Sequence, residues 1–285
     1  MSSVVWEQLV ATPALELPLT FVDVETTGLS PHYGDRVCEV AAVHYWRGRE
    51  VERFASLVNP GRGITPAAAA VNGITAAMVR GAPRFADVAG DLRRLLAAGI
   101  TVAHNAPFDL AFLAHELSFA GRPLPATPVV DTLALARRCF SFPSNSLGSV
   151  AAQLGIAGPG HRALSDVLTT RAVFERFVQM LDDPDRPVTL GALITLQGVV
   201  ITWPHPRRDT AVPLPPELSE AVREGRPLRL SYLAPQGVLT ERWVDPIQVV
   251  ARDGVAYLVA YCHLRRAQRT FRIERIVRYE RGTDK

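Results

Sequence analysis

The sequence predicts an α/β protein: a mixed-sheet domain of about 180 residues followed by a smaller, mostly-β domain. Three strand-like runs follow one another directly near the N-terminus, which is typical of an antiparallel meander. Short apolar strands then alternate with helical patterns as far as residue 181. After a proline-rich break, four more strand-like runs indicate a small, strongly bent sheet or barrel.

The meander begins after a short arm of residues 1–16. Its first strand is the apolar run Leu17–Val24, which is short and is followed by the turn-rich loop 28–35. The next two strands are expected at 36–46 and 50–59, because Arg47-Gly48-Arg49 separates two apolar runs.

The alternating part begins with short helices near 66–71 and 75–79. Apolar residues from Phe85 to Leu96 are spaced for one helical face, and Gly99 ends that helix. Pro107 suits the first turn of a helix that runs to about Ala120. The other expected elements are strands at 100–103 and 129–130 and helices at 131–139, 146–154 and 163–181.

Residues 182–216 contain seven prolines, which mark a candidate domain boundary. Within them, Leu190–Ile201 is strongly apolar and must be buried, so we expect it at an interface between the domains. A short helix at 217–224 and strands at 228–233, 242–250, 256–262 and 269–276 follow. The predicted domains are 1–182 and 217–285, with 183–216 as a connecting segment.

Composition is that of an ordinary globular protein, with 48% hydrophobic and 21% charged residues. No apolar stretch reaches the roughly 18 residues of a membrane span, and the N-terminus lacks the pattern of a signal peptide. The three cysteines lie far apart, which argues against a disulfide framework or a zinc site. We therefore expect no membrane contact and a cytoplasmic location.

Charge differs between the two parts. Residues 217–285 carry a net charge of +4, whereas the preceding 216 residues carry a net charge of −1. A modestly basic C-terminal part is compatible with nucleic-acid binding.

Two carboxylates stand at the end of the first strand. Asp23 and Glu25 are two residues apart, so both side chains leave the sheet on the same face. Because neighbouring carboxylates repel each other, a divalent cation between them would explain the arrangement. Oxygen ligands suit Mg²⁺ or Mn²⁺ rather than Zn²⁺. The alternative is an ordinary strand end with charged residues in solvent.

Two further segments carry a histidine and an aspartate near a helix start. His104-Asn105-Ala106-Pro107-Phe108-Asp109 follows a buried strand and places Asp109 in a first helical turn. His161 precedes a helix that contains Asp166. Taken singly, each aspartate is compatible with a helix-start or solvated residue, and His161 with a surface or capping residue.

Together, D-x-E-T-T-G, H-N-A-x-F-D and H-x-A-x-x-D resemble the motifs of the DEDDh-type 3′→5′ exonucleases, and most closely the proofreading epsilon subunits of bacterial replicative polymerases. The resemblance runs from about Leu17 to Leu181 and includes Pro60, the segment 71–75 and the Ala82-Pro83-x-Phe85 helix entry. It implies a ribonuclease-H-like fold.

The resemblance also implies catalytic roles. Asp23, Glu25, Asp109 and Asp166 would hold two divalent metal ions, Mg²⁺ or Mn²⁺, which activate the attacking water and stabilise the leaving 3′-oxygen. His161 would be the general base, a role that suits an imidazole. The product would be a nucleoside 5′-monophosphate.

By the same resemblance, other residues would grip the terminal nucleotide. The expected substrate contacts are Thr26, Thr27, Leu29, His104, Asn105 and Phe108, with Leu29 or Phe108 stacking on a frayed base. For Thr26 and Thr27, a structural role in the turn is the alternative.

The C-terminal part resembles the WYL domains of bacterial transcription regulators from about Leu218 to Val277. The match includes Val244-Asp245-Pro246, Tyr257-Leu258-Val259 and Arg269-x-Phe271-Arg272, although Ala256 replaces the Trp of the name. Such domains are Sm- or SH3-like barrels that sense a ligand, often a nucleic acid or nucleotide. The expected ligand contacts are Tyr232, Tyr257, Arg269, Arg272 and Arg275; alternatively, the tyrosines are core residues and the arginines a solvated face.

We therefore expect a metal-dependent exonuclease that acts on DNA 3′ ends in proofreading or repair, with an appended sensing domain. RNA or short oligonucleotides are alternative substrates, because the motifs do not discriminate sugars. A non-catalytic nucleic-acid-binding regulator is the alternative from another class. A DNA polymerase or another replication or repair protein is a further expected partner, although 182–216 contains no clear glutamine-led clamp-binding motif.

Overall fold

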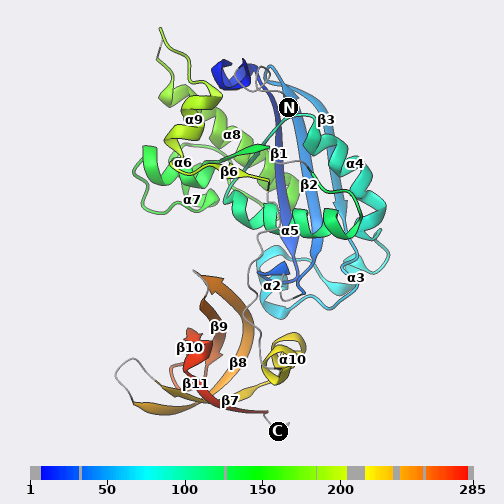
Figure 1. The fold of residues 1–285 in the computed structure, drawn as a ribbon, viewed down its shortest axis with the longest axis vertical. Helices are drawn as coiled ribbons and strands as arrows, with labels where there is room; N and C mark the ends of the chain where they lie inside the picture. Colours follow the sequence, from blue (N-terminus) through cyan, green and yellow to red (C-terminus); the bar gives the residue numbers. More distant parts are fainter. Residues whose placement is uncertain are drawn as a thin grey trace. The chain divides into compact units, whose positions relative to one another are not determined.

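The computed structural model describes residues 8–31, 34–124, 127–183, 185–203, 216–233, 238–252 and 255–281. They form two compact units, one built on a six-stranded sheet and the other on a five-stranded sheet (Figure 1). Within these ranges, no helix is both long enough and apolar enough to cross a membrane.

The six-stranded sheet has the order β3-β2-β1-β4-β5-β6. Its first half is the expected meander, in which β1 (Pro18–Thr26), β2 (Val37–Trp46) and β3 (Arg49–Leu57) pair antiparallel. β4 (Ile100–Ala103) and β5 (Pro128–Asp131) continue the sheet parallel to β1, and β6 (Ile201–Thr202) closes it antiparallel. The prediction of a mixed sheet is confirmed.

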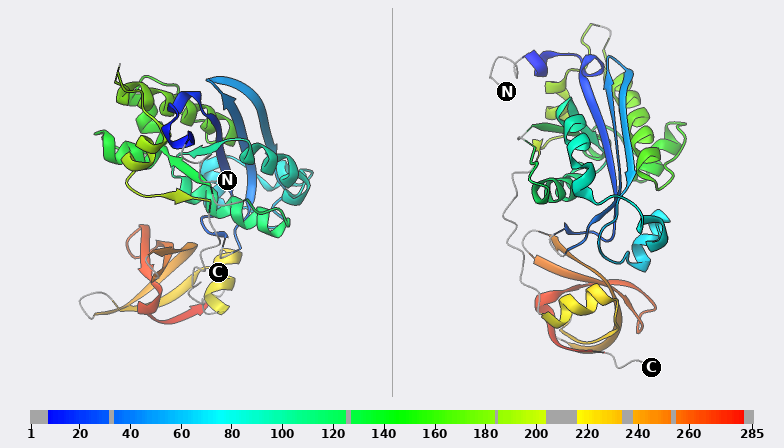
Figure 2. Two further views of the ribbon diagram at one scale, coloured as in Figure 1. Left: turned by 45° about the horizontal axis from the view of Figure 1, so that its top comes forward. Right: turned by 90° about the vertical axis from the view of Figure 1, so that its right-hand side faces the viewer.

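Helices cover both faces of this sheet (Figure 2). Leu19 and Phe21 of β1 belong to the core under α8 (Ala163–Leu181), whereas Val22 and Val24 belong to the core under α4 (Phe85–Ala97) and α5 (Ala106–Phe119). This alternation places Asp23 and Glu25 on the α8 face. The other helices that precede β6 are η1 (Ala14–Glu16), α2 (Pro66–Asn72), α3 (Ala76–Val79), α6 (Thr132–Cys139), α7 (Leu147–Gln153) and α9 (Leu190–Leu196).

The apolar segment after residue 189 differs from expectation. It forms α9 and β6, and the side chains of Leu190 and Leu193 are fully buried in the core of the first unit. Trp203 is also buried there, and its indole nitrogen donates to Oγ1 of Thr101 over 3.0 Å. Residues 190–203 therefore belong to the first unit, whereas the prediction counted them in the connecting segment 183–216.

The second unit contains α10 (Pro216–Glu224) and an antiparallel sheet of order β10-β9-β8-β7-β11. Its strands are β7 (Leu228–Leu233), β8 (Leu239–Arg252), β9 (Val255–Cys262), β10 (Ala267–Arg272) and β11 (Ile276–Arg281). The single strand expected at 269–276 is divided by the one-turn helix η3 (Ile273–Arg275), which raises the strand number to five. β10 and β11 are the two edge strands of this order, so the five strands are described as a sheet and not as a closed barrel. The expected turn at 235–237 and residues 253–254 of the second turn lie outside the described residues.

Candidate active site

The site is built on β1, the strand at the centre of the first sheet. Asp23 and Glu25 lie at its C-terminal end and are partly buried on the face covered by α8. Asp166 reaches the same place from the first turn of α8, and only 9% of its surface is exposed. Ligand oxygens of these three carboxylates lie within 4.8 Å of one another. The structure thus brings together residues from two motifs that are more than a hundred positions apart.

Asp109 approaches the same strand from the first turn of α5. β4 pairs with β1 only as far as Phe21, which leaves the later part of that β1 edge without a strand partner. The amide nitrogen of Val24 instead donates to Oδ1 of Asp109 over 3.0 Å. Asp109 is buried at 3% exposure but lies outside the group of three carboxylates defined above.

Burial and mutual repulsion raise the pKa values of these carboxyl groups. For Asp23, burial is the largest cause, and the charges of Asp109, Glu25 and Asp166 add to it. Burial, followed by the charge of Asp166, raises the pKa of Glu25 to about 7. Burial also raises the pKa values of Asp109 and Asp166. A divalent cation would relieve this repulsion, and an all-oxygen donor set fits Mg²⁺ or Mn²⁺.

His161 stands beside the carboxylates. It is exposed, and its backbone has the left-handed φ of 51°, which a non-glycine residue rarely adopts. It lines a cavity of about 830 Å³ together with Asp23 and Asp166. That volume lies within the roughly 300–1,000 Å³ typical of small-ligand sites. The rest of the wall is mixed: the polar residues are His104, Asn105, Arg137, Ser144, Asn145 and Ser146, and the others are Leu133, Leu147, Gly148 and Pro159.

His104 lines this cavity, but both of its ring nitrogens already have partners. Nε2 lies 3.0 Å from the carbonyl oxygen of Asn145, so this nitrogen donates, and Nδ1 lies 2.9 Å from Oγ1 of Thr132. Burial lowers the pKa of the imidazole. His104 therefore fixes the loop before α7, and its neighbour Asn105 adopts a left-handed φ of 69°.

Of the other expected substrate contacts, three are buried or partly buried and one is exposed. Thr26 and Thr27 are buried, and Oγ1 of Thr27 donates to Asp35 over 3.4 Å. Phe108 is partly buried and packs against Phe112, with ring centroids 5.1 Å apart. Leu29, by contrast, is 49% exposed, so its side chain remains open to a base.

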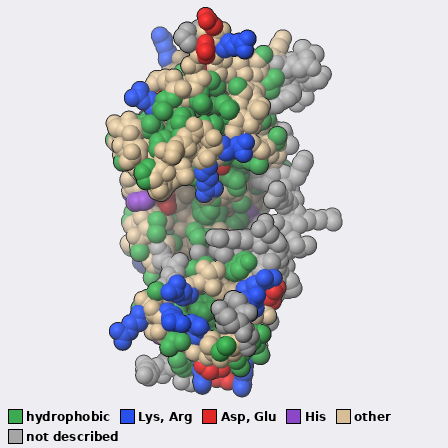
Figure 3. All heavy atoms as spheres, turned by 90° about the vertical axis from the view of Figure 1, so that its left-hand side faces the viewer, with side chains coloured by type: hydrophobic (Ala, Val, Ile, Leu, Met, Phe, Trp, Pro, Cys, Tyr) green, Lys and Arg blue, Asp and Glu red, His purple; other side chains and the backbone are tan. Residues whose placement is uncertain are grey.

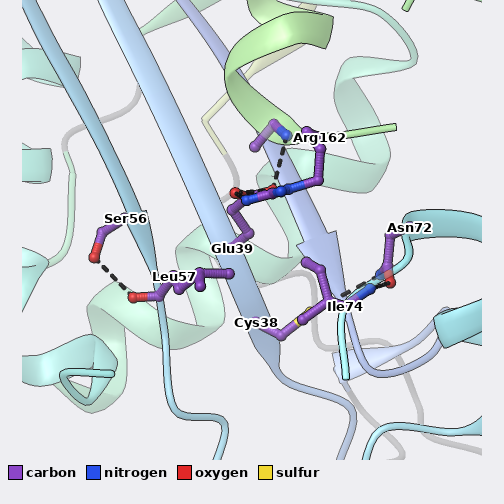
Figure 4. Close-up of polar contacts among 8 residues, drawn as sticks. Cys38, Glu39, Ser56, Leu57, Asn72, Ile74 and Arg162 are labelled. Carbon is purple, nitrogen blue, oxygen red and sulfur yellow. Dashed lines mark hydrogen bonds and ion pairs between the residues drawn. The ribbon is translucent and has the colours of Figure 1, made fainter. Parts of the chain in front are cut away.

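Sequence reasoning missed three residues that surround the site. Glu39 of β2 is the direct cross-strand partner of Glu25, and Arg162 forms an ion pair with Glu39 at 2.6 Å (Figure 4). Asn72 is buried, and its side chain donates to Glu25, which opposes the rise in the pKa of that carboxyl group. A lone glutamate within the apolar run Val37–Val43 was the signal that could have indicated Glu39.

In the C-terminal unit, the tyrosines are part of the fold. Tyr232 packs edge-to-face on Phe271 at 5.1 Å, and its hydroxyl accepts from the amide of Arg272. Tyr257 pairs with Arg272 in the ladder of β9 and β10. Tyr232 thus contributes to the core, which is the structural role considered above for the tyrosines.

The arginines of this unit differ in their surroundings. Arg269 is exposed, Arg275 is partly buried, and Arg272 pairs with Glu274 at 2.6 Å. The Nε atom of Arg272 is buried, and within the described part of the chain it has no hydrogen-bond partner. Figure 3 shows Arg side chains on one face of this unit.

Carboxylates that converge beside a histidine at the edge of a cavity form the arrangement expected of metal-dependent hydrolases. The sequence matches the family described as Exonuclease over residues 20–174 and the WYL domain over residues 214–281. The chain belongs to this exonuclease family. Its first unit is related to the DEDDh-type 3′→5′ exonucleases and to the epsilon subunit of DNA polymerase III, and a WYL domain follows it.

Two relatives illustrate this relationship. A DNA polymerase III subunit epsilon-like protein of Rhodobacter capsulatus is 40% identical over 193 residues, which cover 66% of this chain but only 27% of that protein. The DNA polymerase III subunit epsilon of Treponema pallidum is 36% identical over 166 residues, which cover 57% of this chain and 75% of that protein.

A solved structure supports the fold. E. coli Exonuclease I in complex with a dA16 oligonucleotide superimposes with a TM-score of 0.53 at 18% identity, over 86% of this chain and 55% of that one. The ribonuclease-H-like exonuclease fold is therefore confirmed.

Proposed function

We propose that this exonuclease removes nucleoside 5′-monophosphates from DNA 3′ ends with Mg²⁺ or Mn²⁺ as its cofactor. The observation that carries the proposal is the convergence of Asp23, Glu25 and Asp166, whose ligand oxygens lie within 4.8 Å of one another, beside a cavity that Asp23, Asp166 and His161 line. DNA is favoured over RNA because the names of the two relatives above refer to a DNA polymerase.

Four carboxylates would hold two divalent ions: Asp23, Glu25, Asp109 and Asp166. When bound, the cations would lower the pKa of a coordinated water and offset charge on the phosphate and the leaving 3′-oxygen. Asp109 suits this role less directly than the other three, because its Oδ1 already accepts from Val24. Its second oxygen, Oδ2, would provide the ligand.

His161 is the proposed general base. It takes a proton from the attacking water, the new bond forms between the water oxygen and phosphorus, and the bond between phosphorus and the 3′-oxygen breaks. The electron pair stays on the 3′-oxygen of the shortened strand, and the terminal nucleotide leaves as a 5′-monophosphate. The exposed position of His161 lets the accepted proton pass to solvent.

The cavity wall would hold the terminal nucleotide. Arg137, Ser144 and Ser146 line the cavity and offer donors to a sugar or phosphate. His104 positions that wall through the carbonyl of Asn145, and Leu29 offers an exposed apolar side chain to the base. Thr26, Thr27 and Phe108 would support the turn and helix around it.

The C-terminal domain is proposed to bind a nucleic acid or nucleotide and to adjust the choice of substrate. Its net charge of +4 and the exposed Arg269 favour an anionic ligand. We propose further that its curved sheet is of the Sm- or SH3-like barrel type and that the domains divide near residues 204–216.

The proposal is tested by comparing kcat/KM for a single-stranded DNA and an RNA of the same sequence, with Mg²⁺ or Mn²⁺. We expect the DNA to be the better substrate and chromatography to identify nucleoside 5′-monophosphates as products. A preference for RNA would make the enzyme a ribonucleotide exonuclease, and inactivity on both substrates would favour a requirement for a partner polymerase.

A further inference from the structure

A carboxylate on β2 holds the first residues of α8. Glu39, with 10% of its side chain exposed, accepts from Arg162 Nε at 2.9 Å and from Arg162 Nη2 at 2.6 Å. It also accepts from the amide nitrogen of Ala163 at 3.0 Å. Figure 4 shows the two side chains facing each other between the strand and the start of the helix. The contact joins residues that are 123 positions apart in the chain.

His161 immediately precedes this contact. On its other side, the amide of Gly160 donates to Oδ1 of Asp166 and to Oγ of Ser165, both over 3.0 Å. The backbone of His161 is therefore fixed from both sides. Its left-handed φ of 51° requires such support, because a non-glycine residue keeps that conformation only where its surroundings impose it.

The position of Glu39 makes this pair a costly way to stabilise the fold. Glu39 lies directly opposite Glu25 in the ladder, so it adds a further negative charge next to the carboxylates of the site. A hydrophobic residue would bury more cheaply than Glu39 in this apolar strand, and an ion pair whose arginine side chain is 46% exposed contributes little net stability. Arg162 compensates the added charge and at the same time ties the histidine segment to the sheet.

We propose that the Glu39–Arg162 pair is the positioning device that aims His161 into the cavity. The inference rests on the proposed role of His161 as general base. Glu39 and Arg162 are positioning residues, because they act on the reaction through the backbone of His161.

The first test is a double-mutant cycle between Arg162 and His161. Arg162→Gln should lower kcat by about ten-fold or more with little change in KM, the range seen when supporting contacts are lost. In a His161→Gln background the same substitution should cause no further loss. Equal losses in both backgrounds would overturn the proposal.

Three variants separate positioning from folding. Glu39→Gln/Arg162→Gln removes both charges, so no unpaired charge is buried, and it should lose the same activity as Arg162→Gln. Arg162→Lys should restore part of kcat, because lysine keeps the charge without the two-nitrogen contact. Arg94→Gln is the matched control, since Arg94 also forms a two-nitrogen pair with a strand glutamate, Glu52, and should keep wild-type kcat.

A second readout is independent of activity. In protein labelled with ¹³C-histidine, the ring signal of His161 is identified by its loss in His161→Gln. We expect Arg162→Gln to shift this signal and Arg94→Gln to leave it unchanged. If Arg162→Gln shifts the signal but the wild-type protein cleaves no substrate, only the proposed function is contradicted. An unchanged signal would contradict the positioning role.

Discussion

The amide nitrogen of Val24 donates a hydrogen bond to Oδ1 of Asp109 over 3.0 Å. This bond ties the strand that carries Asp23 and Glu25 to the helix that carries Asp109, the aspartate of the second motif. It depends on β4 ending beside Phe21, because a longer β4 would occupy this edge of β1. The two motifs, 85 residues apart, are thus connected by a hydrogen bond between the backbone of β1 and the side chain of Asp109.

Asp109→Asn tests the charge of this residue separately from its hydrogen bond. The amide oxygen can still accept from Val24, so the fold should be kept, but kcat should fall on the order of 100-fold or more because a metal ligand loses its charge. Asp109→Ala removes the bond as well and should also lower the free energy of unfolding by about 1–3 kcal/mol. Steady-state kinetics and urea unfolding measure the two effects. Wild-type kcat in Asp109→Asn would contradict the role of Asp109 as a ligand.

The acidic cluster predicts a particular dependence of stability on pH. Glu25 has an ordinary pKa of 4.5 and a pKa of about 7 in the fold. Between these values the folded state binds more protons than the unfolded state, so the metal-free protein should lose stability as pH rises from about 4.5 to about 7. Mn²⁺ should stabilise the protein more at pH 8 than at pH 5, because it binds the deprotonated cluster.

Urea unfolding at a series of pH values, with EDTA or with Mn²⁺, measures this dependence. Glu25→Gln removes one of the groups with a raised pKa, so its pH dependence in EDTA should be shallower. If the free energy of unfolding had the same pH dependence in wild type and in Glu25→Gln, the pKa of Glu25 would not be raised in the fold.

Arg36 and Glu116 form the clearest stabilising ion pair of the nuclease unit. The guanidinium contacts both carboxylate oxygens, at 2.7 and 2.6 Å, and the side chain of Glu116 is only 2% exposed. Arg36→Ala leaves that carboxylate buried without its cation and should cost about 2–3 kcal/mol, somewhat less than for a fully buried pair. Arg53→Ala breaks the exposed pair with Glu50 and should cost less than about 1 kcal/mol. An equal decrease in the free energy of unfolding for Arg36→Ala and Arg53→Ala, measured with urea, would contradict this difference.

The C-terminal arginines predict how salt affects binding. If Arg269 and Arg275 contact phosphates, replacing both by alanine should weaken binding of a single-stranded oligonucleotide and lower the slope of log Kd against log salt by about 1 to 2. Arg278→Ala is the control, because Arg278 is exposed in the same unit but pairs with Glu280. Fluorescence anisotropy at several salt concentrations measures the slope. An unchanged slope would exclude these two arginines from phosphate contact.

Local patterns were sufficient for much of this fold. The period-two alternation of β1 predicts that Asp23 and Glu25 share a face. Gly99 predicts the end of α4, and Pro107 predicts the start of α5. The motif order also identified the acidic residues that converge. These features depend on backbone periodicity and turn chemistry, which neighbouring residues determine.

Long-range pairings could not be predicted in this way. The partner of Glu39 is 123 residues away, and no local signal links it to Arg162. His104 satisfies both ring nitrogens through Thr132 and a carbonyl at Asn145, which depends on the path of a distant loop. Likewise, the apolar character of Leu190 and Leu193 predicts burial but not which core receives them.

The central claim is that the carboxylates around β1 drive removal of nucleotides from a 3′ end. The most direct measurement follows a 5′-labelled single-stranded DNA on a sequencing gel, using the full chain with Mg²⁺ or Mn²⁺, with EDTA, and with Asp23→Asn. We expect a ladder that shortens one nucleotide at a time from the 3′ end and that disappears with EDTA and in the variant. Immediate release of the labelled 5′ nucleotide, or an equal ladder from Asp23→Asn, would contradict it.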